Sequence, residues 1–211
     1  EKTSEETRGH HGRHGRGNAA GLFTSSGLAA VYRKQHLVPF GEYIPLDKII
    51  TPLQRLSPIG VSLWPGEGAV FDVPSRSGRT IRLAPLICYE DTDSAQMRAL
   101  LHKGARALVF ITNDSWFSDS IEAEQHSWQA VARAVETGLP VIRVGNSGVT
   151  GTIDPHGRAS WLSNADGRPL VDARGTMCDM VTKLSPPSPT MSPVTFYGML
   201  GDIPLAVSFA L

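Results

Sequence analysis

Cysteine is scarce in this sequence, with only two residues, Cys88 and Cys178, among 211. Two thiols cannot build a disulfide framework, and neither belongs to a CxxC pair, which argues against a zinc ribbon. Net charge is lacking too, because 20 lysines and arginines balance 20 aspartates and glutamates. A neutral chain gives no reason to expect a nucleic-acid partner.

The ends of the chain differ in composition from its middle. Residues 1–17 are polar and hold no apolar signal-peptide region, so we expect a loop or tail there. The proline-rich residues 186–195 predict a linker. Residues 196–211 finish in an apolar run that is too short to span a bilayer, and this run is either a buried strand or the start of a membrane helix. One domain is therefore expected at 18–185, a length that allows a good core.

Strands and helices alternate along this domain, which predicts an α/β fold. In the clearest helix, apolar residues from Trp128 to Val135 recur at i, i+3, i+4 and i+7, and Gly138 provides an end signal. Ala130 and Ala134 would let this helix lie close to a sheet. Strands are expected at 28–33, 69–74, 80–88, 107–112, 140–145 and 149–154, and helices at 91–105 and 120–138.

The first chemical candidate is Cys88, which ends an apolar run and precedes acids in "LICYED". A cysteine in such a place is either a packing residue or a nucleophile. A nucleophilic thiol needs a base or a lowered pKa, and backbone N–H groups after a strand could hold an oxyanion. Tyr89, Glu90 and Asp91 supply polar groups beside the sulfur. The residues alone leave both interpretations open.

Lys34 and Glu42 are the second candidates, in "YRKQHLVPFGEY". A lysine near a thiolate lowers the thiol pKa and can stabilise an oxyanion. An isolated lysine or glutamate is, however, usually a solvated surface charge. Because Lys34 lies 54 positions before Cys88, the sequence alone does not bring the two together.

Four segments carry a resemblance to a known family. The segments are "VYRKQHLVPFGEYIPL", "LAPLICYED", "FITNDSWFSDS" and "EAEQHSWQAVARAVETGLPVIRVGNSGVTGTIDPHGR". They resemble the nitrilase-type domain of apolipoprotein N-acyltransferase, a branch of the carbon–nitrogen hydrolase superfamily, and the match runs from about Asn18 to Arg158. The resemblance implies an α/β fold of the nitrilase type, a four-layer αββα sandwich.

The same resemblance implies an enzyme with a Glu-Lys-Cys triad. Cys88 matches the nucleophile, Lys34 the oxyanion-stabilising lysine, and Glu42 a further glutamate that the family needs near the site. The general-base glutamate of the family lies in an early strand, well before the lysine. Only 33 residues precede Lys34, and none of their glutamates matches that strand. We therefore expect a sandwich that is incomplete on its N-terminal side, and the base is not assigned.

Three more residues follow from the resemblance. Tyr89 and Glu90 match residues that support the nucleophile. Trp116, in "NDSWF", falls in a segment that borders the substrate site, where it is either a packing aromatic or a lipid contact.

The activity implied by the resemblance is N-acyl transfer. An acyl chain moves from a phospholipid, through a cysteine thioester, to the N-terminal diacylglyceryl-cysteine of a lipoprotein, and no cofactor or metal takes part. The place implied is the bacterial inner membrane, with the domain on its periplasmic side, and residues 196–211 then begin a closing membrane helix. Two alternatives remain at this point: a soluble amidase or nitrilase, and an inactive fragment that binds lipid or a partner.

Overall fold

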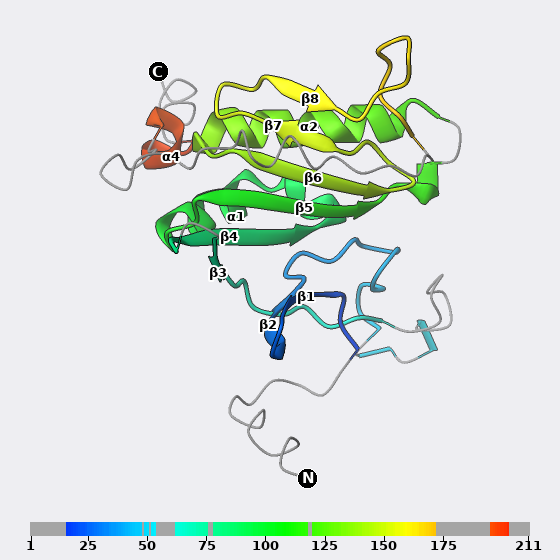
Figure 1. Ribbon diagram of the computed structural model, residues 1–211. Helices are drawn as coiled ribbons and strands as arrows, with labels where there is room; N and C mark the ends of the chain where they lie inside the picture. The colour runs from blue at the N-terminus through cyan, green and yellow to red at the C-terminus, as the bar shows by residue number, and fades with distance from the viewer. Residues whose placement is uncertain are drawn as a thin grey trace, which may run out of the picture.

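The computed structural model describes residues 16–47, 49–50, 52–53, 62–75, 78–117, 120–171 and 195–202 (Figure 1). Its centre is a six-stranded sheet with the order β3-β4-β5-β6-β7-β8. Strands β4, β5 and β6 run parallel, and the outer strands pair antiparallel to their neighbours. The strands are β3 (Phe71–Pro74), β4 (Thr80–Ile87), β5 (Ala107–Asn113), β6 (Val141–Asn146), β7 (Gly151–Ile153) and β8 (Ala159–Trp161).

Two helices, α1 (Ser94–His102) and α2 (Glu122–Thr137), cover one face of this sheet (Figure 1). They are the crossover connections between the parallel strands, as the alternating sequence pattern predicts. The main hydrophobic core lies between these helices and strands β4 to β7. Gly138 ends α2 with φ of 65°, a left-handed conformation that favours glycine.

The buried face of α2 differs from the apolar spacing that predicted the helix. Trp128 and Val135 lie mostly on the exposed side of α2, while Ala130 and Ala134 are fully buried against the sheet. Small side chains allow a helix to approach a sheet closely, and a tryptophan at the same place would hold it away. The sequence thus predicted the helix and the close approach of its alanines to the sheet. Of its apolar stripe, Val131 packs against the core and the two ends are exposed.

A two-stranded antiparallel sheet packs on the opposite face. It consists of β1 (Ala19–Thr24) and β2 (Gly27–Arg33). A second, smaller core joins it to the large sheet through Tyr32, Phe71 and Ile87. Strand β2 was predicted from the sequence and β1 was not, because its small residues give a weak strand pattern.

The described residues therefore form an α/β arrangement with a helical layer, a six-stranded sheet and a two-stranded sheet. A second helical layer is not seen in this described part of the chain. The small sheet covers the large one only partly, since Ile111 and Val144 remain 42% and 46% exposed. An apolar groove lies between the two sheets, lined by residues of β1, β3, β4 and β5.

Three short elements complete the described fold: the 3-10 turns η2 (Cys88–Thr92) and η3 (Ser115–Phe117), and the helix α4 (Phe196–Leu200). The predicted tail at 1–17 and linker at 186–195 lie almost wholly outside the described residues, as does the apolar run after Asp202. Within the part of the chain that is described, no helix has the length and apolar character needed to cross a bilayer.

Candidate active site

Cys88 lies at the point where β4 ends and the turn η2 begins. It is a free, half-buried thiol at the carboxyl edge of the parallel strands. Its φ of 53° places a non-glycine residue in the left-handed region, which costs of order 1 kcal/mol unless the surroundings hold it there. Such strain at the tip of a strand is typical of a functional position.

Lys34 and Glu42 form a buried ion pair. The Lys34 Nζ lies 2.7 Å from a Glu42 carboxylate oxygen, and the lysine side chain is fully buried. The Val38 N–H donates to the same oxygen and Asn18 donates to the other one. Burial alone would raise the pKa of Glu42, but the hydrogen bonds and charge of its partners hold that pKa below its ordinary value. Glu42 is therefore a carboxylate that fixes the lysine ammonium.

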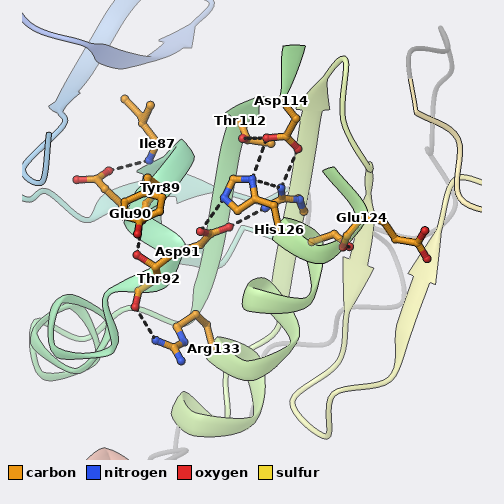
Figure 2. Close-up of polar contacts among 12 residues, drawn as sticks. Ile87, Tyr89, Glu90, Asp91, Thr92, Thr112, Asp114, Glu124, His126 and Arg133 are labelled. Atoms are coloured by element: carbon orange, nitrogen blue, oxygen red, sulfur yellow. Dashed lines mark hydrogen bonds and ion pairs between the residues drawn. The ribbon is translucent and has the colours of Figure 1, made fainter. Parts of the chain in front are cut away.

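Glu90 joins the end of β2 to the end of β4. Its carboxylate is fully buried and accepts a hydrogen bond of 2.7 Å from the Ile87 N–H, drawn in Figure 2. The other oxygen accepts 2.7 Å and 3.2 Å bonds from the N–H groups of Gln35 and His36. Since Gln35 follows Lys34 and Ile87 precedes Cys88, one carboxylate brings the neighbours of both residues to the same place.

The side chains of Tyr32 and Gln96 also bind the Glu90 carboxylate. The Tyr32 hydroxyl donates to the Glu90 carboxylate at 2.7 Å, and Gln96 donates to it at 3.1 Å. Burial and the neighbouring Glu90 charge raise the pKa of Tyr32, so its hydroxyl stays protonated and remains a donor. These hydrogen bonds connect the turn η2 to β2 through Tyr32 and to α1 through Gln96.

Unlike those of the buried Lys34 and Glu90, the side chains of Tyr89 and Trp116 are exposed at the surface. Tyr89 is about half exposed and Trp116 is 67% exposed in the turn η3. Trp116 follows β5 and Cys88 follows β4, so both lie at the carboxyl edge of adjacent parallel strands. The structure therefore does not make Trp116 a packing residue among the described residues.

A third group was missed by the sequence reasoning. Behind η2, the His126 ring lies between the carboxylates of Asp91 and Asp114, as Figure 2 shows. The Arg143 guanidinium contacts both carboxylates from β6. We call Asp91, Asp114, His126 and Arg143 the charged cluster; all four are buried.

A family model described as carbon-nitrogen hydrolase matches residues 3–177. The chain belongs to the carbon–nitrogen hydrolase family. A known structure has the same fold, a carbon-nitrogen hydrolase from Helicobacter pylori G27, which superposes with a TM-score of 0.50 at 18% sequence identity. The superposition covers 75% of this chain and 54% of the Helicobacter pylori chain. The nitrilase-like α/β fold expected from the sequence is thus confirmed.

Curated relatives of this carbon–nitrogen hydrolase chain are apolipoprotein N-acyltransferases. The one from Haemophilus influenzae is 35% identical over 174 residues, which is 82% of this chain and 30% of that protein. The one from Agrobacterium fabrum is 44% identical over 129 residues, 59% of this chain and 23% of that protein. The chain thus spans less than a third of the length of these relatives.

A signal for the charged cluster was present in the sequence of this family member. Arg143 interrupts the apolar strand "PVIRVG", and His126 lies four positions before the buried Ala130 on α2. A charge inside a buried strand requires a buried partner of opposite sign. That rule would have predicted acids near Arg143, but not that they would be Asp91 and Asp114.

Proposed function

We propose that this chain carries the acyl-transfer site of a bacterial apolipoprotein N-acyltransferase. In this proposal Cys88 is the nucleophile, Lys34 stabilises the oxyanion, and Glu42 holds Lys34 in place. Tyr89 and Glu90 support the turn, and Trp116 contacts lipid. The identity to curated N-acyltransferases supports the branch, and the buried Lys34–Glu42 pair supports the chemistry.

The first half-reaction forms a thioester. A general base takes the proton of the Cys88 thiol, and the thiolate attacks the acyl ester carbon of a phospholipid. The Lys34 ammonium stabilises the negative oxygen of the tetrahedral intermediate. The intermediate collapses, the lysophospholipid leaves with a proton, and the acyl chain stays on the sulfur.

The second half-reaction consumes the thioester. The α-amino group of a diacylglyceryl-cysteine at a lipoprotein N-terminus attacks the thioester carbonyl, and the thiol is released. Both substrates lie in a bilayer, so the proposal places the enzyme at the bacterial inner membrane with this domain on the periplasmic side. The reaction needs no metal or organic cofactor.

One observation carries the proposal more than any other. The Glu90 carboxylate binds the backbone beside Lys34 and the backbone beside Cys88 at the same time. It therefore supports a common site for a strained thiol and a buried ammonium that lie far apart in the sequence.

The test uses the full-length protein in detergent micelles with a phospholipid labelled in its acyl chain. We expect label on Cys88 that hydroxylamine removes, identified by mass spectrometry of the peptide. Addition of a diacylglyceryl-cysteine peptide should move the label to the peptide amine. Cys88→Ala should abolish the label, while Cys178→Ala should retain it.

Other outcomes of this experiment separate the alternatives. Release of labelled fatty acid to water, with none on the peptide, would show a hydrolase instead of a transferase. No label on Cys88 under any condition would support a protein that binds lipid without turnover. Label that persists in Cys88→Ala would disprove the assignment of the nucleophile.

A further inference from the structure

The charged cluster lies directly behind the turn that carries Cys88 (Figure 2). Its members come from four segments: Asp91 from η2, Asp114 from the position after β5, His126 from α2 and Arg143 from β6. None is more than 8% exposed. The acyl-transfer chemistry proposed above uses none of them.

The geometry favours a positive charge on His126. Its Nδ1 lies 2.8 Å from an Asp114 oxygen and its Nε2 lies 3.0 Å from an Asp91 oxygen. An ionised carboxylate only accepts hydrogen bonds, and the two acids lie closer to the ring nitrogens than the Arg143 Nη2, at 3.1 Å, lies to Nδ1. These contacts favour donation from both ring nitrogens, which makes the ring an imidazolium. The cluster is then neutral, with two carboxylates balanced by His126 and Arg143.

The Arg143 guanidinium disfavours a positive charge on His126, whereas the carboxylates of Asp91 and Asp114 favour it. The Arg143 Nη2 lies 3.1 Å from the His126 Nδ1, which disfavours a second cation. Its Nη1 and Nη2 also bind Asp91 at 2.7 Å and Asp114 at 3.1 Å. Burial lowers the pKa of His126, but the hydrogen bonds to Asp114 and Asp91 raise it to about 9. The ring of Phe117 also contacts the His126 ring, in a T-shaped arrangement, and carries no charge.

The cluster connects two segments of the proposed site. Asp91 lies three positions after Cys88 in the same turn. Asp114 lies two positions before Trp116 and is further fixed by a 2.7 Å bond from the Thr112 hydroxyl. His126 is the group that binds both acids from the helix. A rigid contact here would hold the strained Cys88 backbone and the Trp116 segment in one relative position.

We propose that His126, in its charged form, is a positioning residue that fixes the Cys88 turn relative to the Trp116 segment. The catalytic benefit rests on the proposed acyl transfer, whereas the mechanical link does not. The link requires the balance of charge: without the imidazolium proton, two buried carboxylates face one guanidinium, and the turn loses a partner.

Three variants separate charge from shape. His126→Gln leaves the cluster with one excess negative charge. The double variant His126→Gln/Asp114→Asn restores neutrality and keeps polar groups in both places. His102→Gln, an exposed histidine on the neighbouring helix, is the matched control. All are made in the full-length protein in a Cys178→Ala background, so that Cys88 is the only thiol of this chain.

Two readouts do not depend on acyl transfer. Hydrogen exchange should increase more in peptides covering 86–92 and 113–117 of His126→Gln than in the β7–β8 region. The rate of Cys88 alkylation by iodoacetamide should change about tenfold. In the double variant both properties should return at least halfway to their normal values, and His102→Gln should match the parent. For the reaction itself, kcat should fall and KM should change little.

Clear outcomes would overturn the proposal. Exchange that rises equally over the whole domain, or a double variant no better than His126→Gln, would reduce His126 to a general stability role. If His126→Gln does not fold, the parent protein serves: its 86–92 peptide should lose protection as the pH rises through 9, after correction for intrinsic exchange. Unchanged protection there would also reject the proposal. An exchange and alkylation pattern as expected, together with no acyl transfer, would instead reject the proposed function alone.

Discussion

Glu90 illustrates, at the level of a single residue, how a buried carboxylate can organise a site. It accepts hydrogen bonds from five residues on three elements and the loop after β2. The sequence resemblance indicated only that it supports the nucleophile. Its partners come from positions up to 58 residues away, and no local pattern encodes such pairings.

Replacing Glu90 with glutamine tests this organisation. The amide would turn an NH2 group toward N–H donors, leaving several of them unpaired in a buried place. We expect Glu90→Gln to lower the free energy of unfolding by about 2–4 kcal/mol. Urea denaturation measures the change, with the exposed Glu67→Gln as control. A change under 0.5 kcal/mol in Glu90→Gln would contradict the proposed network.

Lys34 allows a test of transition-state stabilisation. Removal of a single oxyanion donor typically lowers kcat by about 10²–10³-fold. We expect Lys34→Ala to show a loss of this size with a nearly unchanged KM, because the ammonium binds the oxyanion more than the ground-state ester. Lys34→Arg should not restore the rate, since the lysine is fully buried beside Glu42 and a guanidinium is larger.

The exposed Lys103→Ala is the control for this measurement. Its kcat should equal that of the parent protein. A Lys34→Ala protein that folds and keeps kcat within threefold would exclude Lys34 as the oxyanion donor.

At the scale of elements, α2 shows what the sequence could and could not predict. Its length and its glycine end were predicted, because helical periodicity and a left-handed terminator are local properties. Its contact face was predicted only in part. Ala130 and Ala134 lie against the sheet as expected, but His126 and Arg133 share that buried side, and their partners Asp91 and Thr92 come from another element. Strand β1 escaped prediction for a similar reason, since its pairing with β2 defines it more than its residues do.

The turn between β4 and η2 gives a prediction about backbone strain. Cys88 has φ of 53°, which any residue with a Cβ adopts at a cost of about 1 kcal/mol relative to glycine. Cys88→Gly should therefore be more stable than Cys88→Ala by about 0.5–1 kcal/mol. Thermal unfolding of the two proteins measures the difference.

The control substitution to glycine should have the opposite effect on stability. Ala99 lies on the exposed side of α1, and Ala99→Gly should be less stable than its parent by about 1 kcal/mol. If Cys88→Gly were also less stable than Cys88→Ala, the left-handed backbone at Cys88 would be wrong.

At the scale of the whole molecule, the fold was predictable and the site only in part. The α/β alternation and the family resemblance gave the architecture, since crossover topology follows from the order of elements. The candidate residues of the site were also named from the resemblance. Their contacts were not, because the Glu90 network and the charged cluster each join segments that only the completed sheet brings together.

The charged cluster makes the stability of the whole domain depend on pH. The pKa of His126 in the folded protein is about 9, above its ordinary value of 6.5. The folded state therefore holds this proton more tightly than the unfolded chain does. The stabilisation is complete below pH 6.5 and is lost as the pH rises through 9, and it amounts to about 3 kcal/mol. Urea denaturation at intervals from pH 6 to pH 9.5 should show this decline in the parent protein. His126→Gln should be less stable at pH 6 and nearly flat over the same range, so a parallel decline in both proteins would assign the dependence to other groups.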